Sequence, residues 1–131
     1  MDVKKIATQY HESGFNCAQS VLCANGEYTG LDEKTALAVS GGFGGGVRCG
    51  EICGAVSGAV MAAGICSPYA DSSDLAAKDR IAQISRDITG QFKQQFGCLR
   101  CIDLKRNGHP CAELIEYAAK LAEDTILANR E

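Results

Sequence analysis

Cysteine is the residue type in this chain that offers the most chemistry. Thiolates bind metal ions and iron–sulfur clusters, and paired thiols exchange with disulfides. Three cysteines, at positions 17, 49 and 111, fall where we predict the first turn of a helix. Unpaired backbone N–H groups and the helix dipole favour a thiolate over a thiol at such a place. The 131 residues contain eight cysteines: Cys17, Cys23, Cys49, Cys53, Cys66, Cys98, Cys101 and Cys111.

The interpretation of these cysteines depends on whether the protein is secreted or stays in the reducing cytosol. The chain begins Met-Asp-Val-Lys-Lys and has no apolar run behind this start, so we see no signal peptide. Structural disulfides are rare in a reducing cytosol, where clustered cysteines more often bind metal or carry out redox chemistry. We therefore expect a cytoplasmic protein with reduced or metal-bound thiols.

Composition narrows the function classes. The formal net charge of −3 gives no excess of positive charge that would attract the phosphate backbone of a nucleic acid, so we expect no nucleic-acid partner. The most apolar stretch, Ile52 to Cys66, is shorter than the roughly 20 residues that a membrane span needs. We expect no membrane span, and instead a buried core helix. The length suits a single domain over residues 1–131 with its own core.

The periodicity of apolar residues predicts an all-α fold, a bundle of five or six helices with a buried central helix. The central helix is the fourth, because it is apolar nearly all round. The predicted helices run from a cap at Asp2 to Gly14, from a capping pair at Asn16 and Gln19 to Asn25-Gly26, from Leu31-Asp32 to Gly41, from about Arg48 to Ala63, from caps at Asp71-Ser72-Ser73 to Phe96 with a kink or break at Gly90, and from Pro110 to about Thr125.

The fourth predicted helix carries thiols and glycines at helical spacing. Cys49 and Cys53 are four residues apart and would share one side of the helix. A glycine face lets either a neighbouring helix or a cofactor approach the backbone closely, and spacing alone leaves both open. A glycine-rich loop precedes this helix. It does not match the dinucleotide-binding motif, because Val47 stands where that motif requires glycine. Binding of an anion by the backbone N–H groups of the loop, aided by Arg48, remains an open alternative. The glycines that we propose as cofactor-binding are Gly44, Gly45, Gly46, Gly54 and Gly58.

Two further features offer weaker signals. Cys98-Leu99-Arg100-Cys101 is a Cys-x-x-Cys motif, but it follows a long predicted helix rather than a strand, which argues against a thioredoxin-like protein. Metal ligands use the same spacing. His109 lies near Cys111 and is expected to be a solvated cap rather than a ligand. Cys23 and Cys66 lie near the ends of apolar helices, where free cysteine packs as a small hydrophobe.

Several ordered motifs resemble a known family. Gly14-Phe15-Asn16-Cys17-Ala18-Gln19 is similar to the family's opening motif, and Gly42-Phe43-Gly44-Gly45-Gly46 followed by Cys53-Gly54-Ala55-Val56-Ser57-Gly58 is similar to its central block. The chain resembles the redox-active proteins named for the cysteine pattern C_GCAxxG_C_C, from about residue 3 to residue 125. The label writes Gly-Cys-Ala where this chain has Cys-Gly-Ala. The last two motif cysteines are assigned to Cys101 and Cys111, with Cys98 left open as an alternative for the third position. The extra cysteines of the chain are Cys23, Cys49, Cys66 and Cys98.

The resemblance implies a redox role and leaves its chemistry open. The first hypothesis is an iron–sulfur cluster held by Cys17, Cys53, Cys101 and Cys111 and used for electron transfer. The second is a thiol–disulfide oxidoreductase without metal, with Cys49 and Cys53 or Cys98 and Cys101 as candidate pairs. The third is a structural zinc site in an interaction protein, in which four cysteines coordinate the zinc ion tetrahedrally. Whether the chain is an enzyme stays open. The redox partner protein is not identified, and the small-residue helix face could pair with a second copy as a homodimer.

Overall fold

The computed structural model describes residues 2–130, and the predicted all-α class is confirmed. Within these residues the only extended pairing is an isolated antiparallel bridge between Ile52 and Arg100. Six of the described helices have seven residues or more, in agreement with the five or six predicted. In chain order the elements are α1 (Val3–Glu12), α2 (Cys17–Ala24), α3 (Gly26–Thr29), α4 (Glu33–Ser40), η1 (Gly46–Gly50), α5 (Gly54–Cys66), α6 (Leu75–Phe96), α7 (Cys101–Arg106) and α8 (Cys111–Ala128).

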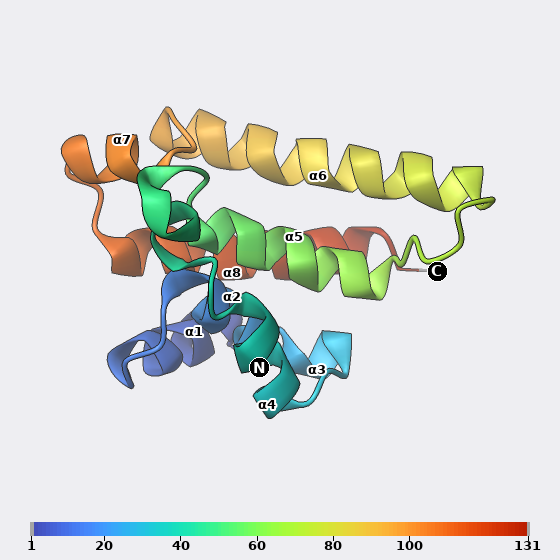
Figure 1. The fold of residues 1–131 in the computed structure, drawn as a ribbon, viewed down its shortest axis with the longest axis horizontal. Coiled ribbons are helices and arrows are strands. Elements are labelled where there is room, and N and C mark those ends of the chain that lie inside the picture. Colours follow the sequence, from blue (N-terminus) through green and yellow to red (C-terminus); the bar gives the residue numbers. More distant parts are fainter. Residues whose placement is uncertain (1, 131) are drawn as a thin grey trace.

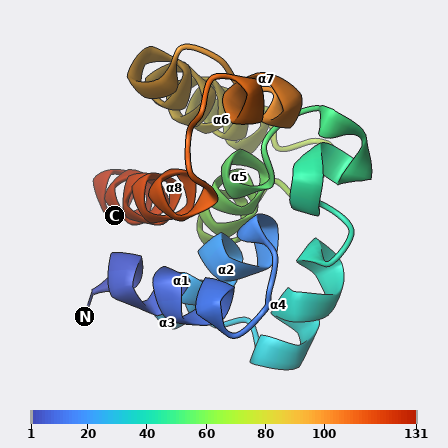
Figure 2. The ribbon, with the colours of Figure 1, turned by 90° about the vertical axis from the view of Figure 1, so that its left-hand side faces the viewer.

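The predicted central helix is present as α5. The long helix α6 covers one side of α5 and α8, and α1 to α4 cover the other side (Figure 1). Seen along the bundle, α5 lies in the middle, with α2, α6 and α8 around it (Figure 2). Ala55, Ala59 and Ala62 on this helix are fully buried. None of the described helices is both long enough and apolar enough to cross a membrane.

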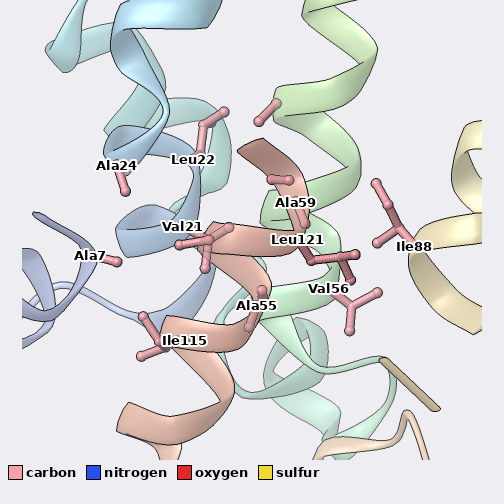
Figure 3. Packing of buried hydrophobic residues seen from close by; sticks show 14 of the residues in the cluster. Ala7, Val21, Leu22, Ala24, Ala55, Val56, Ala59, Ile88, Ile115 and Leu121 are labelled. Atoms are coloured by element: carbon pink, nitrogen blue, oxygen red, sulfur yellow. The ribbon is translucent and has the colours of Figure 1, made fainter. Parts of the chain in front are cut away.

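The core is built from small side chains on α5 and larger ones on its neighbours. Ala55 and Ala59 of α5 lie near Val21 and Leu22 of α2, and Ile115 of α8 belongs to the same buried cluster (Figure 3). Small residues on the central helix let several helices approach it at once, so that branched side chains fill the gaps between them. Burial of this apolar surface is the main stabilising contribution to the fold.

The N-terminal caps of α1 and α2 are formed by the residues that the sequence predicts. The Asp2 carboxylate accepts hydrogen bonds from the Lys4 and Lys5 N–H groups, at 3.1 and 3.2 Å. Asn16 and Gln19 form a complete capping box at the start of α2. Both predicted caps are confirmed, and the second places Cys17 at the first helical position.

Other predicted boundaries need correction. Helix α6 is capped by Asp74, because the side chain of Asp71 is occupied by a turn with Ser73. It then continues through Gly90 without a break, since its apolar stripe packs on both sides of the glycine. Pro110 is the N-cap of α8 rather than its first residue. The expected connector between α6 and α8 contains α7.

The start of the central helix was predicted six residues too early. Instead of continuing a helix from Arg48, the chain forms a left-handed turn in which residues 45–48 all have φ between 58° and 65°. The turn closes with a hydrogen bond from the Glu51 N–H to the Gly46 carbonyl. A right-handed helix cannot pass through such dihedral angles, so α5 begins only at Gly54. Cys49 therefore lies outside the helix that holds the residues after Cys53.

Candidate redox site

Four cysteines from separate segments line one pocket. Cys17, Cys53, Cys101 and Cys111 surround a space of about 50 Å³. The other residues that line it are Gly45, Leu104, Lys105 and Leu114. Pockets for organic ligands usually measure roughly 300–1,000 Å³. This pocket is therefore suited to sulfur chemistry or to a small inorganic group rather than to a large substrate.

Each of the four cysteines stands at the beginning of a helix. Cys17, Cys101 and Cys111 are the first residues of α2, α7 and α8, and Cys53 is the N-cap of α5. Unpaired backbone N–H groups and the positive ends of helix dipoles favour negative charge at these positions. Helix starts of this kind can stabilise a thiolate, and Cys17 is the pocket cysteine whose pKa is lowered. The prediction placed Cys17 and Cys111 correctly at helix starts, whereas the same prediction for Cys49 is wrong.

The position of Cys17 is fixed by polar contacts of its neighbours. The Asn16 amide donates to the Gly41 carbonyl at 3.0 Å, and the Gln19 amide donates to the Leu37 carbonyl at 3.0 Å. Both capping residues of α2 are therefore also tied to the C-terminal end of α4. Gly44 packs against the Asn16 side chain, where a Cβ would approach within 2.6 Å.

Two glycines of the central helix bring α2 against α5. An ideal Cβ on Gly54 would lie 2.5 Å from the Cys17 sulfur, and one on Gly58 would lie 2.7 Å from the Ala18 carbonyl. Contacts this short leave no room for any side chain at either position. The Cys-Gly-Ala-x-x-Gly motif thus has a structural meaning, because its glycines seat the start of α2 beside Cys53. Gly54 and Gly45 adjoin the cysteine pocket, whereas Gly44, Gly46 and Gly58 contact protein groups away from it.

A short antiparallel pairing places Cys53 next to Cys101. The Cys53 N–H donates to the Leu99 carbonyl at 2.8 Å, and the Cys101 N–H donates to the Glu51 carbonyl at 2.6 Å. An ion pair between Arg100 and Glu51, at 3.1 Å, spans the same two segments, although its exposure limits its contribution to stability. The two backbone bonds hold these cysteines beside each other across 48 residues of sequence.

The thiols of Cys17 and Cys53 interact directly. The Cys53 thiol donates a hydrogen bond to the Cys17 sulfur and, against the opposing effect of burial, lowers the pKa of Cys17 to about 6. Backbone N–H groups of Gly45 and Ala18 lower the pKa of Cys17 further. The pKa of Cys53 is raised because its proton is held by Cys17 and its side chain is buried. Cys17 is therefore the thiolate of the pair, and Cys53 is the proton donor.

The glycine-rich loop contributes one N–H group to this arrangement. Its left-handed turn orients Gly45 toward the pocket, where the Gly45 N–H stabilises the Cys17 thiolate. Val47 and Arg48 share the left-handed conformation, which is unfavourable for residues with a Cβ and for a β-branched residue in particular. Strained backbone of this kind is concentrated at functional sites. Arg48 is exposed and does not line the pocket.

Two other cysteines named as pair members lie outside the pocket lining. Cys49 is exposed, and its thiol donates to the Gly46 carbonyl at 3.3 Å. Because the left-handed turn separates it from α5, the predicted side-by-side arrangement with Cys53 is wrong. Cys98 accepts a weak hydrogen bond from Asn107 at 3.8 Å and lines a different surface depression from Cys101. The two ends of the Cys-x-x-Cys motif therefore face different surroundings.

Cys23 and Cys66 occupy packing positions in the bundle. Burial raises the pKa of Cys23 to about 11, and burial also raises the pKa of Cys66. The Cys66 thiol donates to the Tyr28 carbonyl at 3.4 Å. Both thiols pack against the apolar core, as expected for cysteines that act as small hydrophobic residues.

Features around Cys111 differ from the sequence-based expectation. Its apolar spacing predicted a core-facing side chain, yet Cys111 is exposed while still lining the pocket, because the first turn of α8 extends beyond the core. His109 is half-buried and stacks edge-on against Phe96, with ring centroids 5.4 Å apart, so it is not a solvated cap.

Lys105 is a lining residue that sequence reasoning missed. It follows Cys101 by four residues on α7, so both side chains fall on one face of that helix. This spacing would have been informative had the 101–106 segment been predicted as helical. Lys105 adds positive charge to the pocket lining, which contains no carboxylate.

The side chains that the structure describes do not form a preformed metal-binding site. Among residues 2–130, no group of three or more His, Cys, Asp or Glu side chains is arranged to hold a metal ion. The four cysteines share a pocket lining, but their sulfurs are not gathered at coordination distance from one point. A cluster or zinc ion would require these side chains to move inward.

Comparison with known proteins gives one match. Residues 15–125 match the model of a family described as "Putative redox-active protein (C_GCAxxG_C_C)". No curated protein and no solved structure matched. The family match spans most of the chain and contains all four pocket cysteines. The chain therefore belongs to the C_GCAxxG_C_C family.

Proposed function

We propose that this protein transfers electrons by reversible oxidation of Cys17 and Cys53 to a disulfide. The observation that supports this proposal is that Cys17 and Cys53 line the same small pocket, where the Cys53 thiol and nearby backbone N–H groups lower the pKa of Cys17. A thiolate is the nucleophile in disulfide exchange, and a second thiol within reach completes the reaction. The pair differs from both candidate pairs that the sequence suggested.

The proposed reaction has two exchange steps. The Cys17 thiolate attacks a disulfide of the partner, forms a mixed disulfide and releases one partner thiol. In the mixed disulfide Cys17 no longer accepts the Cys53 proton or carries a charge, so both of its effects on the pKa of Cys53 are gone. Burial still raises this pKa, and the N–H groups of Ala55 and Val56 lower it. Cys53 attacks the Cys17 sulfur and releases the second partner thiol. Two electrons pass to the partner. The one proton of the pair, which Cys53 holds, leaves with one partner thiol, and the other partner sulfur leaves as a thiolate that takes a proton from solvent.

A redox titration of metal-free protein tests this function. Reduced protein is equilibrated in glutathione buffers of graded ratio, quenched with acid and mapped by peptide mass spectrometry. The expected product is a Cys17–Cys53 disulfide with a two-electron dependence on potential, lost in Cys17→Ser and in Cys53→Ser. Cys23→Ser is the matched control and retains the disulfide, because Cys23 lies in the core. Reduced thiols at both positions throughout the titration would exclude the proposal.

A second candidate is an iron–sulfur cluster, with Cys17, Cys53, Cys101 and Cys111 as ligands. The observation that favours it is the convergence of these cysteines, from four helix starts, on one small pocket. Backbone N–H groups at helix starts can donate to cluster sulfur and tune its potential. In that case the protein would carry single electrons. We rank it second because residues 2–130 contain no preformed ligand cage.

Metal analysis separates the candidates. Protein expressed and purified anaerobically is analysed for iron, acid-labile sulfide and zinc. Iron and sulfide in equal amounts, together with a brown colour that is lost in Cys101→Ser, would establish the cluster. Stoichiometric zinc lost in the same variant would indicate the structural zinc site. Metal-free protein with a titratable Cys17–Cys53 couple supports thiol exchange.

We place either activity in the cytoplasm, where low potential keeps free thiols reduced. A homodimer stays a prediction. The small-residue face that suggested it is occupied within the chain, because Gly58 packs against the backbone of Ala18 in α2.

A further inference from the structure

Access to the cysteine pocket is uneven. Cys53 and Cys101 are 4% and 9% exposed, and Cys17 is partly covered. Cys111 is the exposed cysteine of the four. A disulfide in a folded partner protein carries bulk on both sides, which hinders its approach to a partly covered sulfur that lines a pocket of about 50 Å³. Direct attack by Cys17 therefore suits a small disulfide better than a protein disulfide.

The surroundings of Cys111 leave its side chain open. Pro110 before it and Ala112 and Glu113 after it are all exposed, as are Asn107 and Gly108 of the preceding turn. Cys49 is also exposed, but it does not line the pocket, so a disulfide formed there has no short path to Cys17. Cys111 alone among the four pocket cysteines combines exposure with a place in the lining.

We infer that Cys111 is the entry cysteine through which a protein disulfide exchanges with the buried Cys17–Cys53 pair. This inference rests on the proposed thiol–disulfide function. Cys111 attacks the protein disulfide, forms a mixed disulfide and releases the first partner thiol. Cys17 then attacks the Cys111 sulfur and releases the second partner thiol. Finally Cys53 attacks Cys17, which closes the Cys17–Cys53 disulfide and returns Cys111 as a thiol. The net change is oxidation of one dithiol and reduction of one partner disulfide.

Two oxidants of different size test this route. Methoxy-polyethylene glycol of 5 kDa with a terminal 2-pyridyl disulfide represents a bulky disulfide, and diamide represents a small oxidant that enters the pocket. Both are applied to reduced Cys49→Ser protein, in which the exposed cysteine outside the pocket is removed. The Cys17–Cys53 disulfide is quantified by peptide mass spectrometry over time.

The expected results distinguish the steps. In the Cys49→Ser parent, both reagents give the Cys17–Cys53 disulfide. With Cys111→Ser added, the polymer reagent forms it at least tenfold more slowly, whereas diamide still forms it. With Cys17→Ser added instead, Cys111 stays joined to the polymer, and the protein shifts by 5 kDa on a non-reducing gel. Cys111→Ala repeats the comparison without a serine hydroxyl at the helix start.

Contrary results have separate meanings. Oxidation of both Cys111 variants by the polymer reagent at the parent rate would overturn the entry role and leave the proposed function intact. Loss of the diamide reaction in both variants would also overturn it, because Cys111 would then belong to the environment of the pair itself. Failure of diamide to form the Cys17–Cys53 disulfide in the parent would refute the proposed function together with the inference.

Discussion

The sulfur of Cys17 lies against the α-carbon of Gly54, so that a Cβ at position 54 would come within 2.5 Å of it. The same Cβ would lie 2.8 Å from the Phe43 carbonyl, which belongs to the backbone and cannot rotate away. The helix that carries the thiolate and the helix that begins beside its partner thiol therefore meet at a glycine. Small changes at this position should affect stability and thiol chemistry together.

Gly54→Ala is expected to lower the free energy of unfolding by about 1–3 kcal/mol, the usual cost of overpacking a close contact. It should also change the alkylation rate of Cys17, because the added methyl group displaces the sulfur. Gly90→Ala is the matched control. Gly90 lies within α6 with nothing near its Cβ position, so alanine there should raise the free energy of unfolding by about 0.5–1 kcal/mol. Urea denaturation measures both, and equal effects of the two substitutions would contradict the packing role of Gly54.

The pH dependence of alkylation should identify Cys17 as the thiolate. With a pKa of about 6, its reaction with iodoacetamide should rise through pH 6 and become flat above about pH 7. Cys53→Ala removes the hydrogen bond that lowers this pKa most, so the midpoint should move up toward the ordinary value near 9. Cys23 serves as the internal comparison, because its pKa of about 11 keeps it a thiol in this range. Peptide-resolved alkylation rates test these expectations, and a Cys17 midpoint near 9 in the unmodified chain would rule out the assignment.

The lowered pKa of Cys17 also predicts a pH-dependent stability. Between pH 6 and 9 the folded state holds the Cys17 thiolate, whereas the unfolded chain still binds the proton. The contribution of Cys17 to the free energy of unfolding is therefore fully present above about pH 9 and is lost as the pH falls through 6. The difference in stability between the unmodified chain and Cys17→Ser should grow across this window. Urea denaturation at several pH values measures it, and a constant difference would contradict the shift.

Local sequence signals predicted the parts of the site that depend on local structure. The Asn16 and Gln19 capping pair placed Cys17 at the start of α2, and Pro110 placed Cys111 close to the start of α8. These signals act within a few residues and do not depend on the rest of the fold. The choice of four cysteines among eight was different, because it came from the family resemblance and not from spacing.

The remaining parts depend on contacts between distant segments or on unusual backbone. Val47 and Arg48 have no local preference for a left-handed turn, and the apolar pattern predicts a helix from about Arg48 onward. Backbone hydrogen bonds of Cys53 with Leu99 and of Cys101 with Glu51 join segments that are far apart in the chain. No local sequence pattern in either segment predicts this pairing. The proximity of Cys17 and Cys53 follows from another tertiary contact, the packing of α2 against Gly54 and Gly58 of α5. This contact between distant segments explains why the sequence suggested other thiol pairs.

The left-handed turn should store measurable strain. Val47→Asn replaces a β-branched residue at φ 58° with one that tolerates this conformation, so we expect the free energy of unfolding to rise by about 1 kcal/mol. Val39→Asn is the control, because Val39 is similarly exposed, at 54% against 50%, but lies in the regular helix α4. Valine and asparagine have similar helix propensities, so this change should stay within about 0.5 kcal/mol. Thermal and urea unfolding compare the two variants, and destabilisation by Val47→Asn would show that the turn is not strained.

A buried carboxylate far from the cysteine pocket provides a test of the fold itself. Glu123 is 6% exposed, and it accepts hydrogen bonds from the Tyr28 hydroxyl at 2.6 Å and from Lys120 at 2.9 Å. The Tyr28 hydrogen bond is the main cause of its lowered pKa. Tyr28→Phe removes that donor and leaves the carboxylate less well satisfied, so the free energy of unfolding should fall by about 1–3 kcal/mol at neutral pH.

The effect of Tyr28→Phe should depend on pH with a definite sign. A lowered pKa in the folded state adds stability above the unfolded pKa of Glu123, and this stability is lost as the pH falls through the folded value. The difference in the free energy of unfolding between the unmodified chain and Tyr28→Phe should therefore become smaller at acidic pH. Tyr117→Phe is the control, because the Tyr117 hydroxyl makes only an exposed 3.4 Å hydrogen bond to the Gln91 carbonyl, and its loss should cost less than about 0.5 kcal/mol. Urea denaturation at neutral and acidic pH measures these differences, and equal losses for both tyrosines would show that Glu123 does not depend on Tyr28.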